Sequence, residues 1–310
     1  KLNLRIPKVV VSSAGVFHAY HVARGAQSGG YLHRFITSLY SRGETGLHHS
    51  QVVQIRMAAY FSLALSTLPG EYARALSYYL GDNLYDRLAS RHARDADIFH
   101  AFNHQGLHSL RIAKHYGAIT IVERSSAHPT YQYELLSNEF ARFGLRYPAI
   151  YRVLHDKHIA EYAEADYIMV ASEFVRRTMV DAGVPDAKLI RVHLGFDPAR
   201  FYPGEKADEV FRVMYAGRIT LQKGVQYLLQ AFSNLEIPHS ELLLAGEIEP
   251  DAKALLTSFE GTFRHVRYVP QSELANLYQQ ASVFVLPSIQ DGFGMVVYEA
   301  AACGLPIIVT

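Results

Sequence analysis

The sequence predicts an α/β protein made of two Rossmann-like halves, each a doubly wound parallel sheet. Three observations predict this fold. Short apolar runs alternate with helical segments both before and after residue 197, which is the pattern of parallel strands joined by crossover helices. A polar, turn-rich stretch at residues 195–204 separates the two alternations and is expected to be a linker. At 310 residues the chain is long enough for two domains, expected at residues 1–197 and 198–310.

The first half begins with an expected strand at residues 8–12, then Gly15, then a helix that ends near residue 26. Residues 51–92 are expected to be helical, because they contain little Pro or Gly and many Tyr, Leu and Ala. Gly183 is the expected stop of the last helix. The other strands are expected at residues 32–37, 97–102, 118–123, 167–171 and 189–193, and the other helices at residues 107–115, 150–164 and 173–181.

The second half repeats the alternation without a long helical insert. Its strands are expected at residues 210–215, 242–245, 266–269, 283–286 and 307–309, and its helices at residues 224–235, 252–259, 272–280 and 296–303. Because the chain starts at Lys1 and stops next to the last of these strands, we expect it to be a fragment whose second sheet is incomplete.

Composition excludes several classes of protein. Hydrophobic residues make up 49% of the chain and charged residues 19%, which suits a globular core. A formal net charge of +1 gives no field that would attract nucleic acid, so no nucleic-acid partner is expected. The single cysteine, Cys303, excludes a disulfide framework and fits a cytoplasmic location. Residues 57–68 are the most apolar helical stretch and are shorter than the about 20 residues that span a bilayer. Peripheral contact with the inner membrane face stays a hypothesis, carried by Arg34, Arg42, Arg87 and Arg91.

Two loops of the second half combine glycine with charge. They cover residues 216–224 (AGRITLQKG) and 287–294 (PSIQDGFG), and each follows an expected strand and precedes an expected helix. Loops that follow parallel strands leave the sheet at its carboxyl edge, where open α/β folds bind ligands. We therefore expect both loops to face one crevice.

The side chains of these loops suit a nucleoside diphosphate. Arg218 offers a forked donor and Lys223 a point charge for phosphate oxygens. Gly292 and Gly294 allow close approach of the backbone just before a helix N-terminus, which favours anions. Glu299 lies in an otherwise apolar stretch of that helix, where an unused carboxylate is costly, and it can accept hydrogen bonds from ribose hydroxyls.

At this point the sequence resembles a known family. Residues 291–299 (DGFGMVVYE), followed by AAACGLPII, resemble the E-x7-E signature of family-four retaining glycosyltransferases of the GT-B fold, also called glycosyl transferases group 1. Residues 215–224 (YAGRITLQKG) are similar to the YAGRL…KG element of that family. Further similar segments occur in the expected order at residues 165–174, 183–185, 195–197 and 201–203.

The resemblance implies a role for each matching residue. Arg218 and Lys223 would hold the donor diphosphate and stabilise the charge of the leaving group, without a metal ion or cofactor. Asp291 takes the place of the glutamate that contacts the donor sugar, and its side chain is one methylene shorter. Glu299 would bind the ribose. The remaining donor-binding residues are expected to be Gly15, Gly217, Gly292, Phe293, Gly294 and Met295.

The resemblance also implies candidates in the first half. Residues 122–128 (VERSSAH) follow an expected strand, at the place where family members carry a histidine near the donor sugar. His128 is therefore the candidate for that histidine, and Glu123 is a second candidate in the same segment. His18, after Gly15, is a candidate for contacts with the acceptor.

The implied activity is transfer of a sugar, with retention, from a UDP-, GDP- or ADP-sugar to a hydroxyl of a glycan or lipid-linked acceptor. Its expected context is the synthesis of surface polysaccharide or glycolipid. Two alternatives stay open. One is a GT-B epimerase or hydrolase, which would use no acceptor other than water. The other is a nucleotide-sugar-binding protein without transferase activity.

Overall fold

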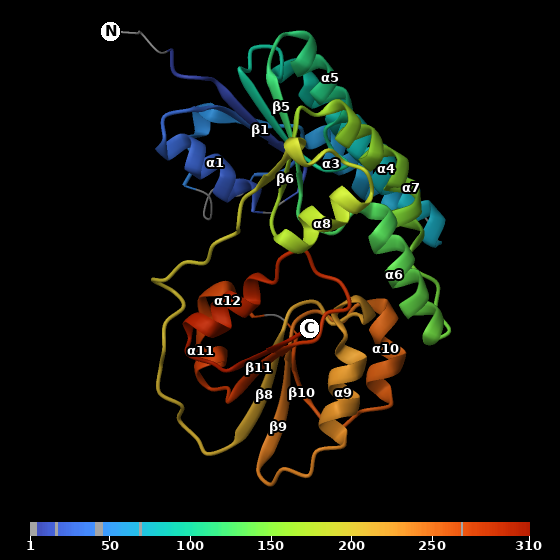
Figure 1. Cartoon of the computed structure of the whole chain (residues 1–310), viewed down its shortest axis with the longest axis vertical. Coiled ribbons are helices and arrows are strands. Elements are labelled where there is room, and N and C mark those ends of the chain that lie inside the picture. Colours follow the sequence, from blue (N-terminus) through green and yellow to red (C-terminus); the bar gives the residue numbers. More distant parts are fainter. Residues whose placement is uncertain (1–4, 16–17, 41–45, 68–69, 268) are drawn as a thin grey trace. The chain divides into compact units, whose positions relative to one another are not determined.

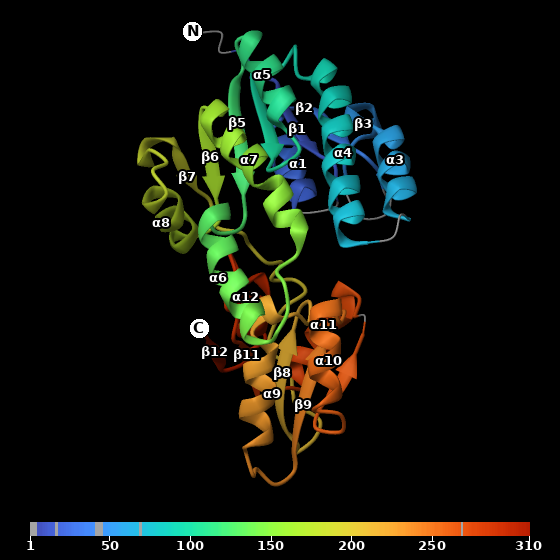
Figure 2. The same ribbon diagram turned by 90° about the vertical axis from the view of Figure 1, so that its right-hand side faces the viewer.

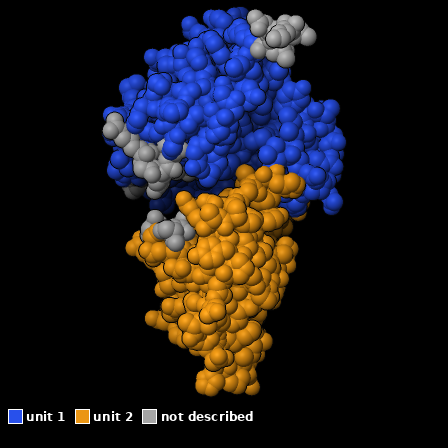
Figure 3. All heavy atoms as spheres, turned by 90° about the vertical axis from the view of Figure 1, so that its left-hand side faces the viewer, with its two compact units in different colours: residues 1–130, 148–192 blue, residues 131–147, 193–310 orange. Residues whose placement is uncertain are grey.

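The structure, a computed structural model, describes residues 5–15, 18–40, 46–67, 70–267 and 269–310. It forms two compact units, which Figure 3 shows in different colours. Unit 1 comprises Lys1–Thr130 and Pro148–Val192, and unit 2 comprises Tyr131–Tyr147 and His193–Thr310. Each unit is built on one parallel sheet with helices packed against it, so the expected two-part α/β fold is confirmed.

The sheet of unit 1 has the strand arrangement of a Rossmann fold. It contains β1 (Val9–Ser13), β2 (Leu32–Thr37), β3 (Val52–Gln54), β4 (Ile98–Phe102), β5 (Ile119–Arg124), β6 (Tyr167–Val170) and β7 (Leu189–Arg191). The order is β3-β2-β1-β4-β5-β6-β7, and every pairing is parallel. The strand order reverses between β1 and β4, so the loops after these two strands flank the topological switch point.

Helices cover both faces of this sheet (Figures 1 and 2). They are α1 (Ala19–Ser28), α3 (Arg56–Ser66), α4 (Glu71–Ala89), α5 (Leu107–His115), α7 (Ala149–Glu164) and α8 (Glu173–Asp181), with 3-10 turns at His49–Gln51, Ser90–His92 and Asp186–Lys188. Helices α4, α5 and α7 pack on one another and on one face, with buried Phe99 and Leu110 between helices and sheet. Helix α1 packs on the other face, around Val11 and Phe35.

The expectation that residues 51–92 are helical throughout is wrong at its start and in its middle. Residues Val52–Gln54 form the edge strand β3, because Val52 and Val53 pair with Phe35 and Ile36 of β2. The rest of the segment is divided between α3 and α4, and Gly70, with a φ of 98°, immediately precedes α4. A three-residue strand is too short to show its alternation of apolar and polar residues in sequence.

Unit 2 contains a second, smaller parallel sheet. Its strands are β8 (Phe211–Ala216), β9 (Ser240–Ala245), β10 (Arg264–Val266), β11 (Val283–Leu286) and β12 (Ile307–Val309), in the order β10-β9-β8-β11-β12. A 3-10 turn at Leu221–Lys223 precedes α9 (Val225–Ser233), and the other helices that follow are α10 (Pro250–Thr257), α11 (Gln271–Gln279) and α12 (Met295–Ala302). Figure 1 shows α9 and α10 on one side of the sheet and α11 and α12 on the other.

The core of unit 2 is a single cluster around the central strands, with Met214, Leu243 and Phe284 fully buried. Cys303 is also buried in this cluster, as expected for a small apolar side chain. The strand expected at residues 266–269 is placed too late in the chain, because β10 starts two residues earlier, at Arg264, and ends three residues earlier, at Val266, where its register pairs Arg264–Val266 with Leu243–Ala245. Residues 192–210, between β7 and β8, form neither helix nor strand.

One helix, α6 (Pro129–Arg142), was not predicted from the sequence. Most of its length belongs to unit 2. The Glu139 carboxylate of α6 is buried and accepts hydrogen bonds from Gln226 Nε2 at 2.9 Å and from the Tyr227 hydroxyl at 2.7 Å, both on α9. Residues 131–147 therefore belong to unit 2, although the segments before and after them in the chain belong to unit 1.

Candidate functional site

The two glycine-containing loops of unit 2 lie next to each other, because they follow neighbouring strands. Strand β8 pairs in parallel with β11, matching Val213 with Val283 and Met214 with Phe284. The loop after β8 and the loop after β11 therefore leave the sheet at the same carboxyl edge. This is the edge at which parallel α/β sheets bind ligands.

Hydrogen bonds join these two loops directly. The backbone N–H of Ile289 donates to the carbonyl oxygen of Gln222 at 3.0 Å, and the Gln222 side-chain amide donates to Gln290 Oε1 at 3.0 Å. Gly224 has a φ of 69°, and a Cβ there would lie 1.7 Å from the carbonyl oxygen of Pro287. Only glycine fits this approach of one loop to the other.

Lys223 and Asp291 form an ion pair across the loops. Lys223 Nζ lies 2.5 Å from Asp291 Oδ2, and the side chains are 16% and 27% exposed. The other carboxylate oxygen of Asp291 accepts the N–H of Gly292 at 2.9 Å. The cation and the acid that the sequence analysis selected on separate loops are thus in direct contact.

Arg218 lies on the first loop with its guanidinium turned outward. The side chain is 60% exposed, and Nη1 lies 3.6 Å from Glu249 Oε1. The backbone of Arg218 is fixed by a hydrogen bond, because the buried Tyr215 hydroxyl donates to the Arg218 carbonyl oxygen at 2.6 Å. The adjacent Gly217, with a φ of 138°, forms the turn that leaves β8. Arg218 is therefore a cation on a fixed backbone with a side chain that can reach a ligand.

Glu299 lies in α12, downstream of the second loop. Its carboxylate is buried, and the Tyr278 hydroxyl of α11 lies 3.2 Å from Oε2. Burial, and then the neighbouring Glu299 charge, raise the pKa of the Tyr278 hydroxyl, so this group stays a hydrogen-bond donor. The sequence predicts Glu299 as a site residue, but it gives no signal for Tyr278, which orients Glu299.

The remaining candidates of unit 2 surround the start of α12. Gly294 immediately precedes the helix, Met295 is its first residue, and Gly292 is buried. The ring of Phe293 stacks on Tyr298, with the ring centroids 4.8 Å apart and an angle of 2° between the planes. This pair gives the loop a flat aromatic surface.

In unit 1, Glu123 is held between two histidines at the carboxyl end of β5. The buried carboxylate bonds to His18 Nε2 through Oε1, and His100 Nε2 lies 3.0 Å from Oε2. Burial alone would raise the pKa of the Glu123 carboxyl, but the bonds to His100 and His18 outweigh it and lower that pKa. Gly15 lies in the turn after β1, where its carbonyl oxygen accepts a hydrogen bond from Ser13 Oγ at 3.1 Å.

The contact between His100 and Glu123 is not predicted from the sequence. The signal lies in the strand register, because β4 and β5 pair His100 with Ile121 and Phe102 with Glu123. Residues two apart on a strand share a face, so His100 and Glu123 lie on one face of adjacent strands. That register becomes visible only when the pairing is known.

His128 is fixed through its backbone. The buried Arg124 guanidinium donates from Nη2 to the carbonyl oxygen of Ala127 at 2.6 Å, and the N–H of His128 donates to Thr178 Oγ1 at 3.0 Å. Burial, followed by the nearby positive charge of Arg124, lowers the pKa of His128 to about 4. The Thr130 N–H donates to Nδ1 at 3.3 Å, so the neutral ring carries its proton on Nε2 and offers one donor there.

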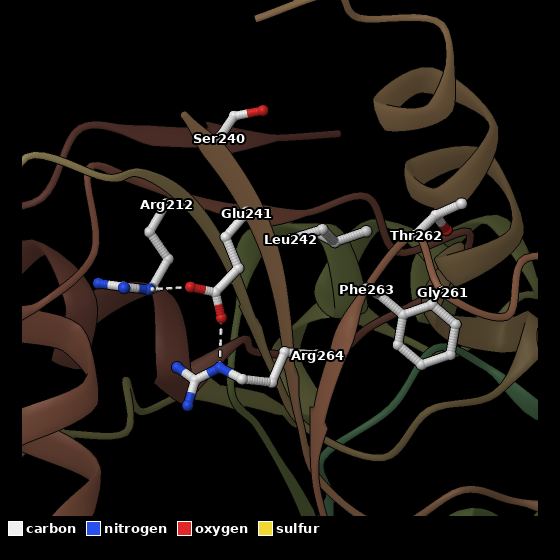
Figure 4. Close-up of a pocket in the computed structure, with 8 residues that line it drawn as sticks. All are labelled: Arg212, Ser240, Glu241, Leu242, Gly261, Thr262, Phe263 and Arg264. Atoms are coloured by element: carbon white, nitrogen blue, oxygen red, sulfur yellow. Dashed lines mark hydrogen bonds and ion pairs between the residues drawn. The ribbon is translucent and has the colours of Figure 1, made fainter. Parts of the chain in front are cut away.

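Two further features of the structure concern metal binding and a surface hollow outside these residues. Among the described residues, no group of three or more His, Cys, Asp or Glu side chains is arranged to hold a metal ion. A surface hollow lies at the amino ends of β8, β9 and β10 (Figure 4), where Glu241 binds both Arg212 and Arg264. Because this hollow lies at the opposite sheet edge from the two loops, it contains none of the predicted site residues.

Comparison with known sequences identifies similar proteins. Residues 200–310 match the model of the family described as glycosyl transferases group 1. An uncharacterised glycosyltransferase of Methanocaldococcus jannaschii is 26% identical over 200 residues, which are 58% of this chain and 51% of that protein. A D-inositol 3-phosphate glycosyltransferase of Mycolicibacterium smegmatis is 32% identical over 164 residues, covering 47% of this chain and 37% of that protein. The matches span about half or less of the length of these curated relatives.

Solved structures support the fold over nearly the whole chain. Sucrose-phosphate synthase from Thermosynechococcus elongatus superposes with a TM-score of 0.70 at 19% identity, covering 98% of this chain and 81% of that one. HepE from Anabaena, in complex with UDP-glucose, gives a TM-score of 0.66 at 15% identity, covering 98% of this chain and 80% of that one. At these identities the likeness bears on the fold alone, and it confirms the expected GT-B fold.

Proposed function

Because residues 200–310 match the family described as glycosyl transferases group 1, we propose that the chain transfers a sugar from a nucleoside-diphosphate sugar to an acceptor hydroxyl. The observation that carries this proposal is the contact between Lys223 and Asp291, made by two loops joined at the carboxyl edge of the unit 2 sheet. A cation and a carboxylate at this edge suit a donor that carries both phosphate and sugar hydroxyls.

In the proposed reaction, the donor diphosphate takes Lys223 as a counter-ion in exchange for Asp291. Arg218, with its exposed guanidinium, then supplies the second cation. As the glycosidic bond breaks, negative charge grows on the departing diphosphate, and the two preorganised cations stabilise it without a metal ion. Asp291, released from Lys223, is free to accept a hydrogen bond from a hydroxyl of the donor sugar.

The other roles follow from the chemistry of each group. Glu299 accepts hydrogen bonds from the ribose, in an orientation set by the Tyr278 hydroxyl. The N–H groups at the start of α12, near Gly294 and Met295, favour the negative donor. His128 donates through Nε2 to a sugar hydroxyl, and Glu123 with His18 contacts the acceptor. Transfer proceeds with retention at the anomeric carbon.

We propose a UDP-sugar as the donor to test first, because HepE, similar in fold, was crystallised with UDP-glucose. The proposed acceptor is a glycan or a lipid-linked glycan, and the proposed location is the cytoplasm. GDP- and ADP-sugars remain the comparison donors. The acceptor named for the Mycolicibacterium relative, D-inositol 3-phosphate, belongs in the first acceptor panel.

Binding and product analysis test this proposal together. Titration calorimetry with UDP, GDP, ADP and the matching nucleosides identifies the base and the contribution of the diphosphate. Incubation with the preferred donor and an acceptor panel then gives the product. A new glycosidic bond with retained configuration supports the transferase, while free sugar alone or an epimerised donor supports the hydrolase or epimerase. Nucleotide binding with no product from any acceptor supports a binding protein.

A further inference from the structure

Helices α3 and α4 of unit 1 expose an unusual number of large apolar side chains. The two helices pack against each other so closely that a Cβ on Gly81 would lie 2.8 Å from Ser62 Cβ. Their outward side chains form what we call the α3–α4 face. Its apolar members are Met57, Tyr60, Phe61, Leu63, Tyr72, Leu76 and Leu80, and all except Phe61 and Leu80 are more than half exposed.

The spacing of these side chains gives each helix an exposed apolar stripe. Tyr72, Leu76 and Leu80 recur every four residues along α4, and Arg87 continues the same line seven residues later. Met57 is followed at three and four residues by Tyr60 and Phe61 on α3, and the buried Ala58 lies outside this stripe. A stripe of this kind on a core helix would face inward, whereas here it faces solvent.

The positive and negative side chains of these two helices differ in their surroundings. Arg56 and Arg87 are both exposed. The three carboxylates are engaged with the protein: Glu71 accepts the N–H of Ala149, Asp82 binds His104 Nδ1 at 2.7 Å, and the buried Asp86 accepts the N–H groups of His108 and Ser109. The α3–α4 face therefore joins apolar and aromatic side chains to arginines.

This combination fits the interface of an anionic membrane. Tyrosine rings favour the headgroup level, leucine and methionine the acyl boundary, and arginine the lipid phosphates. A second copy of this chain fits poorly, because a two-fold pairing of the face with itself would bring Arg56 and Arg87 close to the same arginines of the other copy. Within the described residues, no helix is both long and apolar enough to cross a membrane.

We propose that the α3–α4 face binds the surface of an anionic lipid bilayer. This face shares only Arg87 with the basic patch expected from the sequence: Arg34 is paired with Asp95 at 3.0 Å, and Arg42 lies outside the described residues. The inference rests on the proposed function in one respect: membrane binding would bring the proposed transferase to a lipid-linked acceptor. Lipid binding itself requires no transfer.

Vesicle flotation with the full chain tests this proposal. The probes are vesicles of phosphatidylcholine alone and of phosphatidylcholine mixed with phosphatidylglycerol. We expect the chain to float with the mixed vesicles, to lose binding in high salt, and to bind phosphatidylcholine poorly. The double variant Leu63→Ser/Leu76→Ser should reduce binding to mixed vesicles at least about tenfold, because two large side chains no longer enter the acyl boundary.

Matched controls separate the face from general surface chemistry. Leu235 is 51% exposed in unit 2, the same value as Leu76, and Leu235→Ser should bind vesicles like the parent chain. Arg87→Glu should weaken binding, while Arg146→Glu, at an exposed position of unit 2, should leave it nearly unchanged. Thermal unfolding and UDP titration on each variant show that the fold and unit 2 are intact.

Three outcomes would overturn the proposal. They are no flotation with mixed vesicles, equal loss in the Leu235 and Leu63/Leu76 variants, and a dimer in solution that the Leu63/Leu76 variant dissociates while vesicles remain unbound. The last outcome would assign the face to a second copy. UDP binding is measured separately, so failure of lipid binding and failure of the proposed transferase function are distinguishable.

Discussion

Lys223 Nζ contacts Asp291 Oδ2 at 2.5 Å, although the two residues are 68 positions apart in the chain. The parallel pairing of β8 with β11 explains this contact, because it brings the loops that follow both strands to one edge. The ion pair fixes the position of the Lys223 ammonium group, and both side chains remain partly exposed. For the proposed function, it means that the diphosphate meets an ammonium group already in position.

Replacing Lys223 with Ala should weaken binding of UDP by about 10- to 100-fold, the usual worth of a hydrogen bond to a charged group. Binding of uridine, which lacks phosphate, should change little. Titration calorimetry with both ligands gives the comparison. Lys253→Ala, at an exposed position of α10, is the control and should affect neither ligand. Equal losses for UDP and uridine would contradict a phosphate role for Lys223.

Replacing Glu299 with Gln should remove most of the preference for a ribonucleotide. We expect the parent chain to bind UDP more tightly than 2′-deoxy-UDP by about tenfold, since a buried carboxylate makes strong hydrogen bonds to hydroxyls. Tyr278→Phe should reduce the preference less, because it removes only the hydroxyl that orients Glu299 and keeps the carboxylate. An unchanged ratio of the two affinities in Glu299→Gln would exclude Glu299 from the ribose site.

Turnover should persist after treatment with EDTA, because Arg218 and Lys223 are proposed to supply the charge that a metal would otherwise provide. The measurement is the initial rate of product formation with the preferred donor, with and without added Mg²⁺. A rate that is abolished by EDTA and restored by Mg²⁺ would contradict the metal-free scheme. The control is a metal-dependent transferase assayed in the same buffers.

The sequence predicts the fold well because the apolar strand runs are local features. The runs that become β8, β9, β11 and β12 are readable from a few residues each, and the parallel topology follows from their alternation with helices. The sequence predicts an element less well where pairing with a distant segment determines whether that element forms. Strand β3 and the position of β10 depend on neighbouring strands, and α6 is stabilised in part by the bonds of Glu139 to residues almost 90 positions away.

The candidate site shows the same division. Lys223 and Asp291 could be selected from their loop motifs, since charge and glycine next to expected strands are visible in sequence. The residues that contact Glu299 and Glu123 could not be selected in this way. Tyr278 and His100 are ordinary core residues in sequence, and only the packing of α11 and the register of β4 against β5 bring them to Glu299 and Glu123.

His128 should make stability depend on pH in a defined direction. Its folded pKa of about 4 lies below the usual 6.5, so below pH 6.5 the unfolded chain binds a proton that the folded chain does not. Stability from this group is therefore fully present above pH 6.5 and falls as pH drops toward 4, by on the order of 3 kcal/mol. Urea unfolding between pH 7 and pH 4.5 should show a smaller decline for His128→Gln. Parallel curves for both proteins would exclude His128 as the source.

Replacing Gly224 with Ala should disrupt the contact between the two loops of unit 2. The new Cβ would lie 1.7 Å from the Pro287 carbonyl oxygen, at a φ of 69°. We expect a loss of about 3 kcal/mol or more in the free energy of unfolding, since neither backbone can move without breaking the joined loops. Gly183→Ala separates the causes: its φ of 88° imposes similar backbone strain, and no atom lies within 4 Å of the added Cβ. It should lose only about 1 kcal/mol. Urea unfolding measures both variants, and a Gly224→Ala loss no larger than that of Gly183→Ala would show that the loop contact is not as tight as 1.7 Å implies.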